Sequence, residues 1–434
     1  MIDNNKKSKP IDVSQKIRNS LPKRHFQEKK FKFYGQSAVT LAIFFLFFLF
    51  YLIFTNGIPG LFQHYVTLNV YLDSSRLDPK GDFSDQSLFS GDASKLIYES
   101  LYAEIGGVDE RGEKKIAKSL VSSASDVRLI KHIKENPKLL DSTHSIQFAV
   151  DDDVDSFLRG YISRETPEEE RRLSNLAIQY IDNLNSKGLI TYEFSDYLFS
   201  GSASREAEIA GIKGALVGSI LTMLICLSIA FPLGIMTAIY LEEIAPKNWL
   251  TELIEININN LAAVPSVVFG IMGLAIFIVA FGLPRSIPLV GGIVLALMTL
   301  PTVIISSRAA IKAVPPSIRE AAYGIGASKM QMIFHHVLPL AMPGMLTGTI
   351  IGMAQALGET APLLMIGMVA FIVDVPGGFA EPSTALPVQI FMWADFAERM
   401  FVHKTSAAII VLLVFLLLMN FFAVMLRKKL EKRW

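Results

Sequence analysis

Long apolar runs constrain the fold of this chain more than any other feature of its sequence. We identify six mainly apolar segments of about 20 residues or more, each long enough to cross roughly 30 Å of hydrocarbon as a helix. The expected spans are Ser37–Thr55, Gly214–Tyr240, Leu253–Phe281, Pro288–Ser307, Met345–Phe371 and Thr405–Leu426. The mean hydropathy of +0.40 agrees with them. The sequence therefore predicts a mainly α, polytopic membrane protein with six transmembrane helices.

Basic residues at both ends of the chain predict its orientation. Lys and Arg next to membrane spans favour the cytoplasmic side, and six spans place both ends on one side. A nucleic-acid-binding arm is the weaker interpretation of the basic N-terminus, because an apolar span follows it directly. The expected organisation is a cytoplasmic N-terminus (1–36), a first span (37–55), a periplasmic domain (56–208), a membrane domain (209–426) and a cytoplasmic tail (427–434).

The periplasmic segment is long enough to form one small domain. Its apolar patterns predict three strands, at Thr67–Asp73, Ser145–Val150 and Leu189–Phe194, and three helices, at Ser94–Ala103, Lys114–Ala124 and Pro167–Ser186. We therefore expect an α+β domain. The acidic run Asp151–Asp155 lacks the glycine and the distal glutamate of an EF-hand loop, so a solvated turn is the better interpretation than a calcium site. The single cysteine, Cys226, lies inside a span and excludes an intrachain disulfide.

A polar hairpin, at about residues 312–342, interrupts the apolar segments on the predicted cytoplasmic side. Helix-forming residues lead up to Gly326, which is able to take φ > 0 and end a helix. Lys329–Val337 predicts a second helix, with Pro339 at its end or at a kink. The small side chains of Ala321 and Ala322 would let a partner surface approach closely.

This hairpin resembles the "EAA" loop of ABC importer permeases. The resemblance rests on Glu320, Ala321, Ala322, Gly326, Leu338 and Pro339. In that family the loop docks into a cleft on a separate ATPase subunit, so the resemblance implies that these residues couple the chain to an ATPase. His336 stands where the family usually has an apolar residue.

Three further stretches resemble the PstA family of phosphate permeases. One is Phe199–Ile212, before the second span. Another is Asn260–Leu274, where Pro265 removes a backbone donor and Ser266 offers a hydroxyl. The most specific is Gln355–Leu364, which reads Gln-Ala-Leu-Gly-Glu-Thr-Ala-Pro-Leu-Leu.

The resemblance implies a translocation path bordered by these motifs. The expected path residues are Asn260, Pro265, Ser266, Arg308, Gln355, Glu359 and Thr360. Glu359 is expected near the middle of a span, on the same helix face as Gln355, where an ionisable group is a functional candidate. Relatives often carry arginine where Gln355 and Ile305 stand. Either Arg308 supplies the positive charge that phosphate needs or a partner permease does, and snorkelling of Arg308 to the headgroups is the alternative.

The function that these patterns predict is that of a permease subunit in an ATP-driven phosphate importer of the bacterial inner membrane. The expected partners are a homologous second permease, an ABC ATPase dimer, a periplasmic phosphate-binding protein and membrane lipid, with no nucleic acid. The sequence has no phosphate-binding P-loop, so we expect no enzyme activity, cofactor or metal here, and ATP with Mg²⁺ on the partner ATPase. The alternatives are a permease for another oxyanion, such as molybdate or sulfate, and a phosphate sensor that does not transport.

Overall fold

The computed structural model describes residues 13–369 and 371–430. It divides into two compact units, 1–55 and 56–434. The first unit consists mainly of the helix α1 (Val13–Gly60), which carries the predicted first span and part of the basic N-terminus. The remaining parts of the two predicted basic segments, residues 1–12 and 431–434, lie outside the described residues.

Five described helices are long and apolar enough to cross a membrane, and a bent pair of helices could supply a sixth span. The five are Ser20–Gly60, Lys213–Ile244, Pro288–Lys312, Lys329–Gly358 and Arg399–Lys429. The bent pair corrects the third predicted span, which is not one continuous helix. α11 (Trp249–Ala262) ends before Pro265, and α12 (Ser266–Gly273) begins directly after it, with a bend of 101° between the two helical segments. Pro265 itself is extended (ψ 139°) and lacks a backbone donor, so the helix is interrupted there.

The fifth predicted span also differs from the structure. Its helix starts earlier, at α15 (Lys329–Gln331), passes through the π-helical segment η5 (Met332–Val337) and continues as α16 (Leu338–Gly358). It stops at Gly358, and the short α17 (Ala361–Met365) follows after a break.

Four helices form the central bundle: α10 (Lys213–Ile239), α13 (Pro288–Lys312), α16 and α19 (Arg399–Leu430). α13 lies between α10 and α16, and glycines make the close contacts. A Cβ at Gly344 would lie 2.7 Å from the Cβ of Ala310 on α13, and one at Gly348 would overlap Ser306. The sequence spacing of these glycines predicts a packing stripe, and the structure confirms it.

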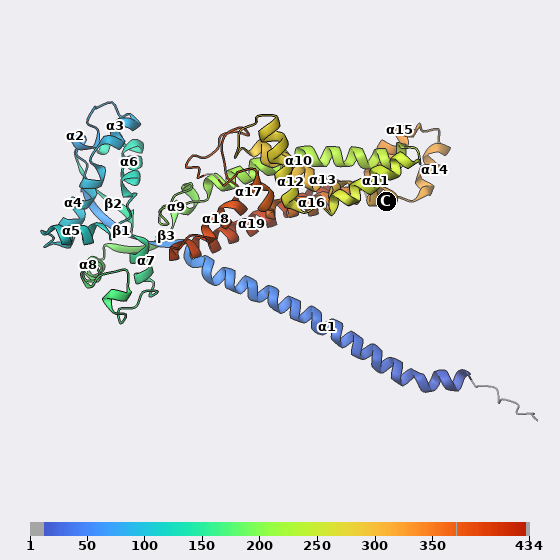
Figure 1. Cartoon of the computed structure of the whole chain (residues 1–434), viewed down its shortest axis with the longest axis horizontal. Coiled ribbons are helices and arrows are strands. Elements are labelled where there is room, and N and C mark those ends of the chain that lie inside the picture. Colours follow the sequence, from blue (N-terminus) through green and yellow to red (C-terminus); the bar gives the residue numbers. More distant parts are fainter. Residues whose placement is uncertain (1–12, 370, 431–434) are drawn as a thin grey trace, which may run out of the picture. The chain divides into compact units, whose positions relative to one another are not determined.

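A separate domain follows α1 in the chain (Figure 1) and contains an antiparallel sheet in the order β2-β1-β3. Its strands are β1 (Phe62–Tyr71), β2 (Thr143–Ala149) and β3 (Ile190–Phe194), close to the predicted strands. Val66, Leu68 and Val70 of β1 are buried in one core with α4 (Ala93–Ile105), α6 (Ser125–Glu135) and α8 (Asn175–Ser186). We refer to this region as the sheet domain. Its short remaining helices are α2 (Ser74–Leu77), α3 (Asp85–Ser90), α5 (Arg111–Lys118), α7 (Asp152–Leu158) and α9 (Asp196–Ser200).

Three expectations for the sheet domain are wrong in detail. The helix predicted from Pro167 begins only at Asn175, because the hydroxyl of Ser174 caps it by accepting from the backbone N–H of Ala177. The helix predicted for Lys114–Ala124 is α5, which ends at Lys118. The acidic run Asp151–Asp155 is not a solvated turn: Asp151 caps the start of α7, and Asp155 is buried.

Candidate functional site

The polar hairpin has the predicted helix–turn–helix form. α14 (Pro316–Gly324) is followed by Gly326 at φ +84°, a backbone conformation that favours glycine. Ser328 then starts the second helix through a capping box with Gln331. The break that the sequence predicts at Gly326 is therefore confirmed. Pro339 neither ends nor begins the second helix, because the π-helical segment η5 runs directly into α16.

The six predicted coupling residues differ in exposure. Glu320, Ala321 and Gly326 are exposed, whereas Leu338 and Pro339 are half-buried at the start of α16. Ala322 is buried against the apolar cluster of the second helix and so holds the hairpin together. The exposed residues are thus available to a partner, and the others support them.

The hairpin also exposes large apolar side chains that the sequence analysis did not single out. Ile325 is 79% exposed, and Tyr323, Met330 and Phe334 are each about half exposed. Side chains of this size on a polar hairpin form a candidate protein-binding surface. Their positions around Gly326 were visible in the sequence, but their exposure was not.

Arg319 joins the hairpin to the bundle. Its Nε and Nη2 donate to Oε1 of Glu243 at 3.1 and 2.7 Å, and its guanidinium also donates to the carbonyl oxygens of Val314 and Ile311 at 2.7 and 3.0 Å. Glu243 lies in the π-helical segment η3 (Tyr240–Ile244), which continues α10. Arg319 therefore ties α14 to the end of α10 and caps the end of α13. Sequence reasoning missed it, because its partner is 76 residues away.

Arg308 lies in a neighbouring ion-pair cluster. Its Nε is 2.5 Å from Oε1 of Glu242, and its Nη2 is 2.7 Å from Oε1 of Glu255. Lys312 also contacts Glu242, at 3.3 Å. The Arg308 side chain is only 10% exposed, and its guanidinium is engaged by two carboxylates. We call the set Glu242, Glu243, Glu255, Arg308, Lys312 and Arg319 the inner cluster.

The remaining path candidates gather at two helix breaks. Asn260 and Pro265 are exposed and Ser266 is half-buried, all at the break between α11 and α12. Gln355 is exposed on α16. Glu359 does not lie mid-helix as expected, but takes the C-terminal capping position of α16. Thr360 takes the N-terminal capping position of α17, without a side-chain hydrogen bond to the helix.

The two breaks lie close together, because α12 packs against α17 (Figure 1). A Cβ on Gly270 would lie 2.7 Å from the Cα of Pro362 and 2.8 Å from the Cβ of Met365. The structure therefore brings the Asn260–Leu274 and Gln355–Leu364 motifs together. Interrupted helices at membrane depth are tolerated where they are buried in protein or line a cavity.

A second polar cluster joins the sheet domain to the bundle. Asp152 Oδ1 accepts from the backbone N–H of Met400 in the first turn of α19, at 3.0 Å. Glu208 Oε1 accepts from the backbone N–H of Asp152, at 3.2 Å. Lys404 of α19 donates to the carbonyl oxygens of Glu208 and Ala210, at 3.0 and 2.9 Å. We call Asp152, Glu208 and Lys404 the outer cluster.

Burial decides the charge of the outer carboxyl groups. It raises the pKa of Glu208 to about 8, and the neighbouring Asp151 and Glu206 act in the same direction. Burial likewise raises the pKa of Asp152. Asp155 is buried too, but hydrogen bonds from His64 and Arg159 outweigh burial and lower its pKa. The two buried carboxyl groups therefore differ: the pKa of Asp155 is lowered, whereas the pKa of Glu208 is raised.

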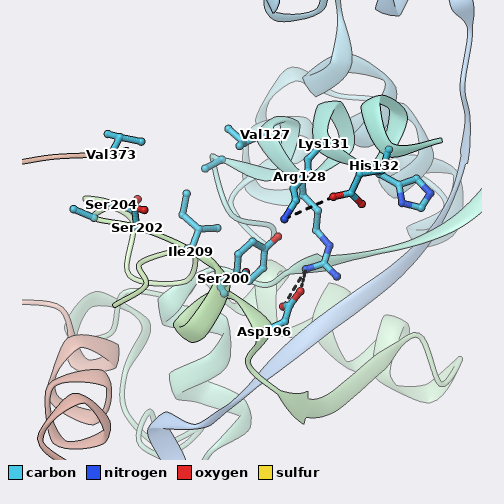
Figure 2. Close-up of a pocket in the computed structure, with 15 residues that line it drawn as sticks. Val127, Arg128, Lys131, His132, Asp196, Ser200, Ser202, Ser204, Ile209 and Val373 are labelled. Carbon is cyan, nitrogen blue, oxygen red and sulfur yellow. Dashed lines mark hydrogen bonds and ion pairs between the residues drawn. The ribbon is translucent and has the colours of Figure 1, made fainter. Parts of the chain in front are cut away.

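The sheet domain also borders a cavity of about 380 Å³, shown in Figure 2. Arg128, Lys131 and His132 of α6 face the segment around Ser200–Ser204 across it. Arg128 bonds to Asp196 at 3.3 Å and lies over the rings of Tyr65 and Tyr197. Lys131 is 4.0 Å from Glu135. Both cations are therefore matched by carboxylates, and the cavity does not present an unbalanced positive charge.

Comparison with known proteins identifies the family. Residues 230–434 match the family described as binding-protein-dependent transport system inner membrane component, and residues 18–168 match a domain of unknown function, DUF3333. A phosphate transport system permease protein PstA from Yersinia pestis is 36% identical over 209 residues, which are 48% of this chain and 70% of that protein. The chain belongs to the ABC transporter permease family. The predicted membership of that family is thereby confirmed.

Other relatives and solved structures are similar to about half of the permease. A phosphate transport system permease protein PstC from Pasteurella multocida is 30% identical over 251 residues, which are 52% of this chain and 77% of that protein. The structure of the MetNI methionine ABC transporter covers 51% of the permease at 16% identity, with a TM-score of 0.41 and 96% of that chain covered. The relatives thus include phosphate permeases of both types.

Proposed function

We propose that this permease is a membrane subunit of an ATP-driven importer of inorganic phosphate. The observation that carries the proposal is its 36% identity to a phosphate permease over 70% of that relative. In this proposal both ends are cytoplasmic, the sheet domain is periplasmic, and the bent α11–α12 pair completes six spans. The protein lies in the bacterial inner membrane.

The exposed surfaces support two of the proposed partners. The hairpin, with Glu320 and Ile325 exposed, would dock on an ABC ATPase that binds ATP and Mg²⁺. α11 has no buried residue and exposes Trp249 and Leu253, so a homologous second permease would cover it. A periplasmic phosphate-binding protein would deliver substrate to the outer face. Hydrolysis belongs to the ATPase, so the permease itself is not an enzyme and needs no cofactor.

In this proposal the path runs along the two packed helix breaks, past Asn260, Pro265 and Ser266 on one side and Gln355, Glu359 and Thr360 on the other. Phosphate needs positive charge or many donors to lose its water. Because Arg308 is engaged by Glu242 and Glu255, the second permease would supply that charge. Glu359, at a helix end, is placed to orient such a cation.

Uptake of labelled phosphate by a strain that lacks this permease, with and without the restored chain, tests the function. Restored uptake that excess unlabelled phosphate abolishes, and that sulfate and molybdate leave unchanged, is the expected result. Competition by sulfate or molybdate would show a different oxyanion substrate. Restored phosphate signalling without uptake would instead identify a sensor.

A further inference from the structure

Four aromatic side chains, three of them exposed and Phe62 half-buried, form a continuous group at one end of the sheet domain. Phe62 opposes Phe194 in the register of β1 and β3, so the two side chains lie on the same face of the sheet. Their ring centroids are 5.8 Å apart. Phe62 also stacks on Tyr192 at 5.7 Å, and Phe194 stacks on Phe199 of α9 at 5.6 Å. We call Phe62, Tyr192, Phe194 and Phe199 the aromatic rim.

The aromatic rim is open to solvent in the isolated chain. Tyr192 and Phe194 are 50% and 51% exposed, and Phe199 is 40% exposed. Strand alternation turns Glu193 away from the rim, and its carboxylate accepts from Gln147 on the other face, at 2.9 Å. The rim is therefore an aromatic surface without a carboxylate of its own on β3.

Backbone contacts place the aromatic rim level with the outer ends of the membrane helices. The N–H of Lys213, the first residue of α10, donates to the carbonyl of Gly201, two residues after Phe199. The N–H of Ser195, next to Phe194, donates to the carbonyl of Leu61. Leu61 packs in one apolar cluster with the first turns of α19.

The contact between the end of α1 and the first turns of α19 independently places the aromatic rim at the height of the helix ends. A Cβ on Gly60 would overlap the carbonyl of His403 and would lie 3.1 Å from the Cβ of Ala407, both in the first turns of α19. Phe62 follows Gly60 by two residues. Three membrane-spanning helices, α1, α10 and α19, thus end or begin within a few residues of the rim.

We propose that membrane lipid is the partner of the aromatic rim, which lies among the headgroups of the outer leaflet and rests the sheet domain on the bilayer. Aromatic rings concentrate at this depth in membrane proteins, because one side of the ring meets hydrocarbon while the other meets the polar interface. The contact sets the height and tilt of the sheet domain over the bundle. The proposal rests on the membrane spans of the proposed function, and not on phosphate as the substrate.

Spin labels on single cysteines test the lipid contact in the complete transporter, reconstituted in lipid nanodiscs. Cys226→Ala removes the natural cysteine, and Phe194→Cys and Phe199→Cys each carry the label. Tyr71→Cys is the aqueous control, because Tyr71 is 52% exposed at the other end of β1, about 30 Å away. Phe47→Cys, in the first span, is the hydrocarbon standard.

Collision rates with oxygen and with a water-soluble nickel chelate give the depth of each label. The ratio of oxygen to nickel collisions at the rim labels is expected to exceed that of Tyr71→Cys several-fold and to fall below that of Phe47→Cys. A ratio equal to that of Tyr71→Cys overturns the proposal, because the rim is then in water. Low access to both reagents also overturns it, because protein then covers the rim. Phosphate uptake by cells that express the same cysteine variants shows separately whether the proposed function holds.

Discussion

The inner and outer clusters both join distant segments of the permease, but they do so with different charges. In the inner cluster, guanidinium groups meet carboxylates directly, as in the 2.5 Å contact of Arg308 with Glu242 and the 2.7 Å contact of Arg319 with Glu243. In the outer cluster, Lys404 donates to carbonyl oxygens, while Glu208 is buried with one carboxyl oxygen that has no bonding partner in the described residues.

This difference in charge predicts how each cluster responds to pH. Paired fixed charges keep the inner cluster closed at any physiological pH, because arginine stays protonated. Burial favours a proton on Glu208, so the outer cluster depends on pH. The inner cluster connects the hairpin to α10 and α13, and the outer cluster connects the sheet domain to α19.

The largest expected effect follows from breaking the inner cluster at Arg319. Arg319→Met leaves Glu243, whose side chain is only 8% exposed, without its partner, at a cost of about 3 kcal/mol. Denaturant unfolding of the purified complex measures this loss, and uptake should fall with it. Adding Glu243→Met should restore part of the stability, because the uncompensated carboxylate is gone. Equal stability of the wild type and Arg319→Met would contradict a stabilising ion pair between Arg319 and Glu243.

The second effect is the pH dependence of the outer cluster. The pKa of Glu208 is about 8 in the folded protein and lies above its ordinary value of 4.5, so the folded state binds the proton more tightly. The stability from this proton is therefore complete below pH 4.5 and is lost as the pH rises through 8, by about 2 kcal/mol between pH 6 and 8.

Unfolding of the wild type and of Glu208→Gln across that range measures the dependence. The glutamine cannot ionise, so its curve should be flatter by the amount that Glu208 contributes. Asp151, Glu206 and Lys404 also act on this carboxyl group and remain in both proteins, which makes the pair a matched comparison. Parallel curves would contradict the protonation of Glu208.

A smaller effect is expected when the turn of the hairpin is changed at Gly326 and its charged residues are left in place. Gly326 has φ +84° and open space around its Cα, so Gly326→Ala costs about 1 kcal/mol of backbone strain without a clash. Gly324→Ala is the control, because that position is also open but its φ is not positive. Recruitment of the ATPase to the purified permease should weaken for Gly326→Ala and stay normal for Gly324→Ala. If both variants recruit the ATPase alike, the turn at Gly326 does not set the docking geometry.

The smallest effect is expected at an exposed ion pair of the sheet domain. Arg164 forms two short hydrogen bonds with Asp182, at 2.8 and 2.6 Å, but the two side chains are 60% and 45% exposed. Exposed pairs contribute little, because solvent screens them and their side chains lose freedom. Arg164→Met should leave the unfolding midpoint unchanged within error. A loss as large as that of Arg319→Met would show that burial does not distinguish the clusters.

Local patterns in the sequence predicted much of the fold. The three strands appear where apolar residues alternate or cluster, and the helix break at Gly326 appears where glycine can adopt a positive φ. The strands and this helix break depend on residues that are close in the sequence, so a short stretch of sequence is enough to predict them. The break at Glu359 was missed, and Pro265 was expected only to remove one backbone donor from a continuous span, because hydropathy runs through both positions without interruption.

The sequence by itself determined that the chain has several apolar helices of membrane-spanning length, a segment with strands and helices, and a polar hairpin with the residues that resemble a coupling loop. Only the tertiary structure decided which charges meet. Consecutive residues Glu242 and Glu243 reach different arginines because successive side chains of a helix point in different directions. The pKa of Asp155 is lowered and that of Glu208 is raised, although both are buried acids, because His64, far away in the sequence, and Arg159 donate hydrogen bonds to Asp155. Ionisation and pairing depend on burial and on partners far apart in sequence, and folding alone brings these together.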